Sequence, residues 1–425
     1  MAHVPLRVSG ECAVPGDKSI SHRALIFGAL ATGTSRVGGI LQSADVQATA
    51  ECLRSFGWDV PALAPTMQIT GAGFRAPFST VAAPLECNNS GTTARLLAGI
   101  AAAQPLTTEF RGDRSLTTRP MSRVSEPLQA MGARFEWLGE SGRLPMRIVG
   151  GELHALSWAS TLNSAQVKSA ILLAGLCAGA RVSVAETIQT RDHTERLLRL
   201  AGADIEAGEG TVSLGPTSAL APVDLVVPGD PSSAAFFVAL AAGASAGMLR
   251  LCNVLLNPLR TGFLRVLERM GARIEVENER DSGGERVGDL VVRPAPLRGT
   301  VILPGEVPSL VDEIPVLAAL AVVAEGETRV TGAQELRVKE SDRISAMVSN
   351  LRRCAVDAEE IPDGLVVRGC RAPRAANVET RGDHRIAMSF GVLAALTGIH
   401  LQIDDPGCVS VSYPTFWSDL ARVTR

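Results

Sequence analysis

The chain has 425 residues, more than one ordinary hydrophobic core accommodates, so two domains are expected. Lys and Arg total 41 against 44 Asp and Glu, which gives a formal net charge of −3. This balance excludes the global positive field of nucleic-acid-binding proteins, so any anion site must be local. Apolar residues make up 46% and aromatic residues 4% of the chain, a composition typical of a packed α/β protein with short turns.

Cysteine and histidine spacing gives no indication of a metal centre. The eight cysteines show no CxxC spacing and the six histidines form no spaced pair, so we expect neither a disulfide framework nor a bound metal. No GxxxxGK[ST] motif occurs, and no cofactor is expected. The opening MAHVPLRVSG lacks the charged-then-apolar order of a secretory signal, and no apolar stretch reaches the roughly 20 residues of a membrane span. We expect a cytoplasmic protein that binds neither nucleic acid nor membrane.

One pattern occurs six times along the chain: a polar Gly/Ser/Asn/Asp turn followed by an Ala/Leu-rich run. Each run is apolar almost all round, which predicts a helix buried in the middle of its domain. The copies lie about 70 residues apart, the spacing of a repeated structural unit. They begin at Val14, Glu86, Ser160, Val227, Leu303 and Thr380.

A second, amphipathic helix is predicted between successive copies. In RPMSRVSEPLQAMGARFEW, from Arg119 to Trp137, apolar residues recur at three- and four-residue spacing and a glycine stops the helix. Related stops occur in FGWDV, AGADIE, MGARIE and, more weakly, CAVDAE. Short runs such as RLPMRIVGG, TVSLG, DLVVRPA and GLVVRG read as the strands that follow. Each repeat therefore contains two helices and several strands, and three repeats would make a domain.

This arrangement predicts an anion site. If the three buried helices of a domain run roughly parallel, their N-termini meet at one surface. Each N-terminus carries unpaired N–H groups and about half a positive charge. Six such ends facing across an interdomain cleft would attract a small polyanion without making the protein basic overall.

The first copy, PGDKSISHR, concentrates polar chemistry on one helical turn. Helical spacing places Lys18 above His22 and Ser19 above Arg23. A serine hydroxyl beside an arginine suits a phosphate or a carboxylate. The alternative is a helix start capped by Asp17 or Ser19, with solvated charges.

The second and third copies offer weaker signals. In NNSGTTAR, Gly91 permits close backbone approach, although a capped helix start explains the motif equally well. Arg119 stands directly before Pro120, so we expect an extended backbone at a helix entrance; a surface arginine is the alternative. LNSAQVKS and QTRDHTER place hydroxyl and amide groups beside an arginine, which suits a polyhydroxylated, phosphorylated ligand.

The last copies carry the carboxylates. In RVKESDR, Lys339, Glu340 and Arg343 fall on one helical face if a helix begins here. This would hold a carboxylate between two cations, either to keep it ionised or for proton transfer. A surface ladder of salt bridges is the alternative. Arg385 is expected on the first turn of the sixth buried helix and Asp312 inside the fifth, where each charge requires a partner or a function.

Taken together, the motifs PGDKSISHR, NNSGTTAR, LTTRPM, NSAQVKSA, RVKESDR and GDHRIAM, in this order, resemble the 5-enolpyruvylshikimate-3-phosphate synthase family over essentially the whole chain. The resemblance implies an α/β fold of two similar domains, each built from three βαβαββ repeats with buried parallel helices and joined by two crossover segments. It implies one discontinuous domain of residues 1–15 and 230–425 and a second of residues 16–229. The active site would lie in the interdomain cleft.

The resemblance also implies an activity. The family transfers the enolpyruvyl group of phosphoenolpyruvate to the 5-hydroxyl of shikimate 3-phosphate. The hydroxyl attacks C2 while C3 is protonated, and the tetrahedral ketal then loses phosphate and a C3 proton. A monomeric, cytoplasmic transferase of the shikimate pathway, which leads to chorismate and the aromatic amino acids, is expected, with these two small molecules as its substrates.

Residue roles follow by motif position, as the resemblance implies them. Asp312, Glu340 and Lys18 are the catalytic set, Asp312 taking the hydroxyl proton and Glu340 handling the C3 proton. The expected phosphoenolpyruvate ligands are Lys18, Gly91, Arg119, Arg343 and Arg385. The expected shikimate 3-phosphate ligands are Lys18, Ser19, Arg23, Ser164, Gln166, Arg191, Asp312 and Lys339. Further members of these sites are Asn89, Arg95, Ala165 and Lys168.

The chain departs from the family pattern at three positions. Ala165 follows Ser164 where many members have a second serine, and we expect Lys168 or Arg191 to offset the lost donor. Val411 stands where one branch has a lysine, so no cation is assumed there. Gly91 is not the alanine of some glyphosate-insensitive members, which leaves sensitivity to that herbicide open.

Two alternative functions are weighed against this reading. The related transferase acting on UDP-N-acetylglucosamine shares fold and donor, but it carries a cysteine in a glycine-rich loop, and NNSGTTAR has none. A non-catalytic anion-binding protein on the same scaffold is disfavoured by Asp312 and Glu340, because carboxylates repel anionic ligands.

Overall fold

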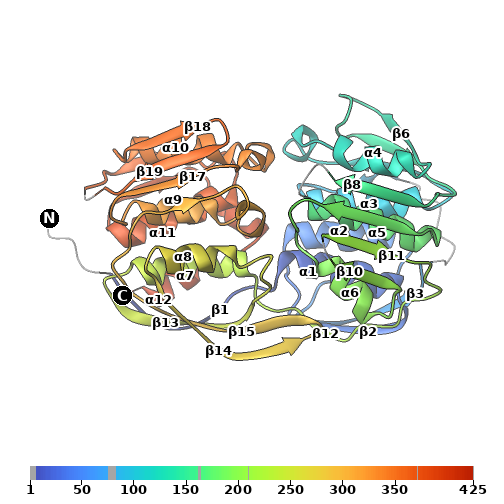
Figure 1. Cartoon of the computed structure of the whole chain (residues 1–425), viewed down its shortest axis with the longest axis horizontal. Coiled ribbons are helices and arrows are strands. Elements are labelled where there is room, and N and C mark those ends of the chain that lie inside the picture. Colours follow the sequence, from blue (N-terminus) through green and yellow to red (C-terminus); the bar gives the residue numbers. More distant parts are fainter. Residues whose placement is uncertain (1–5, 75–82, 161–163, 209, 371, 425) are drawn as a thin grey trace. The chain divides into compact units, whose positions relative to one another are not determined.

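The structure, a computed structural model, describes residues 6–74, 83–160, 164–208, 210–370 and 372–424 (Figure 1). The chain divides into two compact units. Unit 1 comprises Met1–Pro15, Pro228–Asp281 and Glu285–Arg425, and unit 2 comprises Gly16–Val227 and Ser282–Gly284. None of the helices in the described ranges combines the length and apolarity that a membrane span requires.

Three apolar helices occupy the interior of unit 2. They are α1 (Lys18–Leu30), α3 (Gly91–Ala102) and α5 (Ala165–Ala178), and every residue of α1 after Ser19 is buried. Three further helices bury only one face: α2 (Ala44–Ser55), α4 (Ser122–Ala130) and α6 (His193–Leu200). The predicted alternation of buried and amphipathic helices is confirmed in this unit.

The described strands of unit 2 form three sheets that share one pattern. Each sheet has one parallel pair, and the remaining strands add antiparallel. In the second and third sheets the parallel pair is the strand before a buried helix and the strand after it, whereas in the first sheet the strand after α1 pairs with a strand from a remote segment. The first sheet has the order β12 (Leu225–Val226), β2 (Thr32–Gly38), β3 (Thr66–Ala72). The second has β4 (Leu85–Glu86), β5 (Thr107–Arg111), β7 (Met146–Val149), β6 (Arg134–Trp137). The third has β10 (Ile205–Gly208), β11 (Thr211–Leu214), β9 (Val182–Glu186), β8 (Leu156–Ser160).

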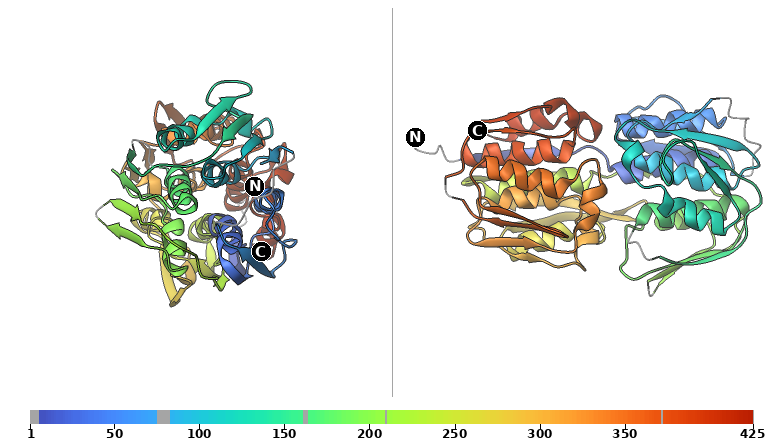
Figure 2. Two further views of the ribbon diagram at one scale, coloured as in Figure 1. Left: turned by 90° about the vertical axis from the view of Figure 1, so that its right-hand side faces the viewer. Right: turned by 90° about the horizontal axis from the view of Figure 1, so that it is seen from above.

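Unit 1 repeats the pattern. Its buried helices α7 (Pro231–Gly243), α9 (Ile314–Ala321) and α11 (His384–Thr397) lie side by side (Figures 1 and 2). The outer helices are α8 (Gly262–Arg269), α10 (Arg343–Arg353) and α12 (Phe416–Val423). One sheet has the order β1 (Arg7–Ala13), β13 (Ala246–Leu255), β15 (Glu285–Arg293), β14 (Arg273–Ser282). Another has β16 (Val301–Ile302), β17 (Glu327–Val330), β19 (Gly364–Arg368), β18 (Ala358–Ile361), and β20 (Ala376–Val378) pairs with β21 (Leu401–Ile403).

Within the described ranges, four short 3-10 helices connect these elements. They are η1 (Leu116–Thr118), η2 (Val307–Ser309), η3 (Gln334–Val338) and η4 (Pro406–Val411). Val411, where no cation was assumed, is the last residue of η4.

The chain passes between the units so that each receives one strand from a remote segment. β1 precedes α1 in the sequence, but it pairs in parallel with β13 of unit 1, from Arg7 opposite Ala246 to Ala13 opposite Cys252. β12 precedes α7, but it pairs in parallel with β2 of unit 2. One repeat of each unit is thus completed by a strand that is distant in sequence.

The predicted helix stops have the expected backbone geometry. Gly132 follows α4 with a φ of 118°, a conformation that glycine adopts without steric cost. The weak fifth stop, CAVDAE, has Ala355 after α10 with a φ of 57°. An alanine in this left-handed region costs roughly 1–2 kcal/mol. The fifth repeat therefore ends its helix in the same backbone conformation, although it has alanine there and not glycine.

Two expected helix positions are wrong. Helix α10 begins only at Arg343, because the Asp342 side chain caps it by accepting a 3.0 Å hydrogen bond from the Ser345 amide. Lys339 and Glu340 therefore precede the helix and do not share a helical face with Arg343. Asp312 lies before α9 rather than inside it, because Pro315 occupies the first turn of that helix, where proline is tolerated.

Candidate active site

The start of α1 holds the first predicted residues. Asp17 caps this helix, accepting a 2.7 Å hydrogen bond from the Ile20 amide. Lys18 Nζ lies 3.2 Å from Asp45 Oδ2, a carboxylate in the first turn of α2. The sequence analysis missed Asp45, although an acidic residue at a helix start is a recognisable signal.

Arg23 is buried and held by three elements of unit 2. Its Nε donates to Thr194 Oγ1 at 2.7 Å, Nη1 to the Ser19 carbonyl at 2.9 Å and Nη2 to Ser169 Oγ at 2.8 Å. The Ser169 and Thr194 hydroxyls also lie 2.7 Å from each other. The guanidinium therefore fixes α1 against α5 and α6, through two hydroxyl residues that the sequence analysis did not single out.

A buried chain of hydrogen bonds runs from His22 to Ser90. His22 Nδ1 is 2.7 Å from Thr49 Oγ1, which is 2.7 Å from Thr93 Oγ1. Thr93 Oγ1 donates to Ser90 Oγ, so Thr49 must donate to Thr93, and His22 Nδ1 must donate to Thr49. Burial, together with the charges of Lys18 and Arg23, lowers the pKa of His22 well below its ordinary value. A neutral imidazole thus links α1 and α2 to the turn before Gly91.

Arg119 has the predicted extended backbone, with φ −87° and ψ 141°. Its Nη2 donates to Asn89 Oδ1 at 2.5 Å and to Ser115 Oγ at 3.0 Å, and Nη1 donates to the Asn89 carbonyl at 3.2 Å. Asn89 Nδ2 in turn donates to Asp113 Oδ2 at 3.0 Å. Asn89 and Arg119 therefore form one rigid pair beside the first turn of α3.

Gly91 lies against two guanidinium groups. A Cβ atom at this position would be 2.7 Å from Arg95 Nη1 and 3.5 Å from Arg119 Nη1. The absence of a side chain thus permits close approach of the arginines to the helix start.

Arg95 joins α3 to α5. Its Nη1 donates to Gln166 Oε1 at 2.7 Å and its Nη2 to the Pro120 carbonyl at 3.2 Å, while Gln166 Nε2 donates to Thr92 Oγ1 at 2.9 Å. Gln166, an expected shikimate 3-phosphate ligand, thereby contacts the same Arg95 guanidinium that lies against Gly91. Ser164 and Ala165 are the cap and the first residue of α5, and Asn163 of the same motif lies outside the described residues.

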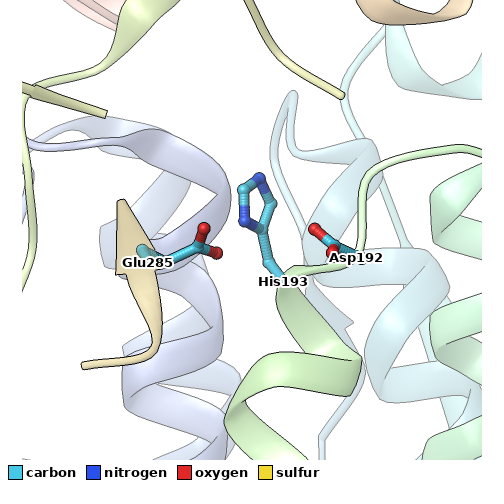
Figure 3. Close-up of side chains that lie close together, drawn as sticks. All are labelled: Asp192, His193 and Glu285. Atoms are coloured by element: carbon cyan, nitrogen blue, oxygen red, sulfur yellow. The ribbon is translucent and has the colours of Figure 1, made fainter. Parts of the chain in front are cut away.

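Lys168 and Arg191 occupy different environments. Lys168 is buried in unit 2, with Nζ 2.7 Å from Glu186 Oε2 and 2.8 Å from Glu195 Oε1. Arg191 is half-buried in the segment that precedes α6, and Asp192 and His193 follow it where the segment enters that helix (Figure 3).

Arg343 is the centre of a second cluster, in unit 1. It is 1% exposed, and its three nitrogens face three carboxylates: Nε is 2.8 Å from Asp383 Oδ2, Nη1 3.2 Å from Asp312 Oδ1 and Nη2 2.6 Å from Glu340 Oε2. Burial opposes the charge, but the three carboxylates outweigh burial and raise the pKa of Arg343.

The five predicted residues of unit 1 come together around Asp312. Its Oδ1 is 3.9 Å from Lys339 Nζ and 4.0 Å from Arg385 Nε, and its carbonyl accepts a 2.9 Å hydrogen bond from Arg385 Nη1. Burial lowers the pKa of Lys339, against the attraction of Asp312. Asp312, Lys339, Glu340, Arg343 and Arg385 thus form one network of alternating charge.

Asp383 is a member of this cluster that the sequence analysis missed. It caps α11 by accepting from the Arg385 amide at 2.9 Å, and it accepts from Ser341 Oγ at 3.0 Å as well as from Arg343. Burial raises the pKa of Asp383, but Arg343 more than reverses this effect and the pKa lies below its ordinary value. The available signal was its place in GDHR, directly before a predicted helix start.

Comparison with known proteins identifies the family. The family model of EPSP synthase (3-phosphoshikimate 1-carboxyvinyltransferase) matches residues 3–420. The chain belongs to this family. It is 46% identical over 424 residues to the 3-phosphoshikimate 1-carboxyvinyltransferase of Aquifex aeolicus, covering 99% of this chain and 98% of that protein. The enzyme of that name from Gloeobacter violaceus is 46% identical over 421 residues, covering 99% of this chain and 97% of its own length.

Solved structures agree with the EPSP synthase assignment. The EPSP synthase of Acinetobacter baumannii superposes with a TM-score of 0.88 at 39% identity, covering 99% of this chain and 97% of that one. The enolpyruvyl transferase NikO of Streptomyces tendae gives a TM-score of 0.76 at 17% identity, covering 100% and 97%, and shares the fold. The α/β fold of βαβαββ repeats expected from the sequence is confirmed.

Proposed function

We propose that this chain transfers the enolpyruvyl group of phosphoenolpyruvate to the 5-hydroxyl of shikimate 3-phosphate and releases phosphate, as a step of the shikimate pathway. Membership of the EPSP synthase family supports this function. The observation that carries it is the unit 1 cluster, in which Asp312 and Glu340 lie within 3.2 and 2.6 Å of one buried guanidinium.

The charge of both clusters suits the substrates. Phosphoenolpyruvate and shikimate 3-phosphate are both polyanions, and arginine forks bind carboxylate and phosphate with two hydrogen bonds each. Lys18, Gly91, Arg119, Arg343 and Arg385 are the proposed phosphoenolpyruvate ligands. Ser19, Arg23, Ser164, Gln166, Arg191 and Lys339 are the proposed shikimate 3-phosphate ligands. The clusters of the two units act on the same pair of substrates in this proposal.

The carboxylates supply the proton transfers. Asp312 accepts the proton of the 5-hydroxyl as its oxygen forms a bond to C2, and Glu340 delivers a proton to C3, giving the tetrahedral ketal. Breaking of the C2–O bond to phosphate then accompanies removal of a C3 proton by the Glu340 carboxylate. Positioned acid–base groups of this kind contribute about 10²–10⁴-fold in rate. Arg343 and Lys339 lie beside these carboxylates. These two cations, together with Lys18 of unit 2, offset the negative charge that the substrates bring.

Acceptor-dependent phosphate release tests the function. The protein is incubated with phosphoenolpyruvate alone, with shikimate 3-phosphate added, or with UDP-N-acetylglucosamine added, and free phosphate is measured. We expect phosphate release when shikimate 3-phosphate is added to phosphoenolpyruvate, and none when UDP-N-acetylglucosamine is added or when phosphoenolpyruvate is alone. Release only with UDP-N-acetylglucosamine would assign the alternative transferase, and binding of shikimate 3-phosphate without any release would assign a non-catalytic protein. A monomer in the cytosol is part of the proposal, and light scattering of the purified chain tests the oligomeric state.

A further inference from the structure

Unit 2 contains a buried lysine that is not among the ligands proposed above. Lys168 is 3% exposed, and besides its contacts with Glu186 and Glu195 its ammonium donates to the Thr190 carbonyl at 3.3 Å. The chain has only three lysines, Lys18, Lys168 and Lys339, among 41 Lys and Arg residues. An ammonium is a compact charge with three donors, which fits a closed cage of three oxygens better than a planar guanidinium does.

The cage fixes every polar group of Thr190. The Thr190 amide donates to Glu186 Oε2 at 3.3 Å, its hydroxyl donates to Glu186 Oε1, and its carbonyl accepts from Lys168. Thr190 is buried, whereas residues 187–189 before it are exposed or half-buried. The segment between β9 and α6 is therefore anchored through Thr190.

The anchored segment carries a proposed ligand at its next residue, Arg191. The central lysine of the cage, Lys168, lies on the first turn of α5. This helix has Ser164 as its cap and contains Gln166. Glu195 lies on the first turn of α6, next to Thr194, which holds Arg23. One buried ion cluster thus connects the elements that carry Ser164, Gln166 and Arg191, and Thr194 beside it holds Arg23.

We propose that Lys168, with Glu186 and Glu195, positions Thr190 and thereby Arg191 for shikimate 3-phosphate, without touching the ligand itself. The inference rests on the proposed function, and it refines the expectation that Lys168 offsets the missing serine donor at Ala165. A segment already held in its binding conformation loses less conformational entropy when the ligand binds. Lys168 stays charged in this role, because the carboxylates of Glu195 and Glu186 outweigh burial and raise its pKa.

Thr190→Val is the sharpest test, because it removes one hydroxyl and keeps the shape of the side chain. We expect KM for shikimate 3-phosphate to rise about 10-fold, the effect of losing a hydrogen bond to a charged group, with kcat and KM for phosphoenolpyruvate within about twofold of wild type. Thr190→Ser restores the hydroxyl and should restore KM. Ser183→Ala is the control, since it removes the hydroxyl that bonds to Ser157 on the same sheet without touching the cage.

Lys168→Met distinguishes positioning from direct contact. We expect a larger rise in KM for shikimate 3-phosphate, and Lys168→Met combined with Thr190→Val should be little worse than Lys168→Met alone, because both act through one network. A melting temperature lowered in Lys168→Met with both KM values unchanged would overturn the proposal. So would a rise in KM in Lys168→Met with none in Thr190→Val, since the ammonium would then act on the ligand directly.

Calorimetry with shikimate 3-phosphate separates this inference from the function. If the wild type binds the ligand but releases no phosphate, the proposed activity fails, and the dissociation constants of wild type and Thr190→Val still test the positioning role. Equal dissociation constants would overturn that role, and a dissociation constant about 10-fold higher in Thr190→Val would support it.

Discussion

Glu340 and Arg343 are joined by a 2.6 Å contact between Oε2 and Nη2, and Arg343 also contacts Asp312, so one guanidinium holds both proposed proton-transfer groups. Arg343 is fully buried, whereas Glu340 retains partial exposure. The carboxylate proposed to handle the C3 proton is therefore held by a buried guanidinium and remains partly exposed to solvent.

Glu340→Gln keeps the size of the side chain but removes its charge and its ability to exchange a proton. We expect kcat to fall by about 100-fold or more, the loss typical of a missing acid–base group, while KM changes less. Steady-state phosphate release measures both. Glu136→Gln is the matched control, because Glu136 makes an exposed 3.0 Å ion pair with Arg147 in unit 2, and its loss should leave kcat unchanged. A Glu340→Gln enzyme with normal kcat would exclude the proposed proton transfer.

Gly91→Ala places a methyl group 2.7 Å from Arg95 Nη1 and 3.5 Å from Arg119 Nη1, so the arginine ends must move. We expect KM for phosphoenolpyruvate to rise about 10-fold, since a displacement of a binding group by an ångström costs this much or more. Gly208→Ala is the control, because a Cβ there meets no atom within 4 Å. Unchanged KM would mean that the Arg95 side chain absorbs the methyl group without loss.

Arg95 and Gln166 should prove energetically coupled. Their 2.7 Å hydrogen bond connects a proposed shikimate 3-phosphate ligand to the arginine beside Gly91. A double-mutant cycle of Arg95→Ala and Gln166→Ala, read in kcat/KM, is expected to give a coupling energy of about 1 kcal/mol, because contacting residues are not additive. Pairing Arg95→Ala with Ser183→Ala, whose hydroxyl bonds elsewhere, should give additive effects. Additivity in the first cycle as well would show that the two ligands act independently.

The buried pair of Asp383 and Arg343 makes stability depend on pH. The pKa of Asp383 lies below its ordinary value of 3.8, so its stabilising contribution is complete above that pH and is lost as pH falls through the folded-state pKa. Asp383→Asn should lower the free energy of unfolding at pH 7 by about 1.5–3 kcal/mol, because the buried guanidinium loses one of its three carboxylate partners and keeps Asp312 and Glu340. The difference in the free energy of unfolding between wild type and Asp383→Asn should become smaller as pH falls below about 4.

Urea unfolding between pH 3 and pH 7 tests this dependence in unit 1, followed through the fluorescence of Trp417 in a background in which the other three tryptophans, all in unit 2, are replaced by phenylalanine. Asp357→Asn is the control, because Asp357 makes an exposed 3.2 Å ion pair with Arg368 in the same unit. If the difference in the free energy of unfolding between Asp383→Asn and wild type did not depend on pH, the ion pair of Asp383 and Arg343 would not be a cause of the loss of stability at acid pH.

The repeat pattern was predictable because it depends on local sequence. Buried helices follow from continuous apolar runs, and helix stops such as Gly132 follow from glycine. The start of α10 was predicted too early. RVKESDR contains more than one residue that can cap a helix, and the sequence does not show that Asp342 is the one that does. Periodicity alone cannot resolve such a choice.

The side-chain partners were less accessible to sequence reasoning. Asp45 and Thr194 contact Lys18 and Arg23 across long sequence separations, so only the fold brings them together. Lys168 was expected, with Arg191, to offset the missing donor at Ala165, but its burial between Glu186 and Glu195 follows only once β9 and α6 are placed against α5. Charges that form a cluster in space carry no common signal along the chain.

The exchange of β1 and β12 has a consequence for biosynthesis and engineering. β1 is synthesised well before its partner, β13, so unit 1 cannot complete this sheet until β13 has been made, and unit 2 can fold first. The Asp230 amide donates to the Pro15 carbonyl at 2.9 Å, so the two crossing points of unit 1 are adjacent. A gene that joins Pro15 directly to Pro228 would therefore encode unit 1 as an uninterrupted chain.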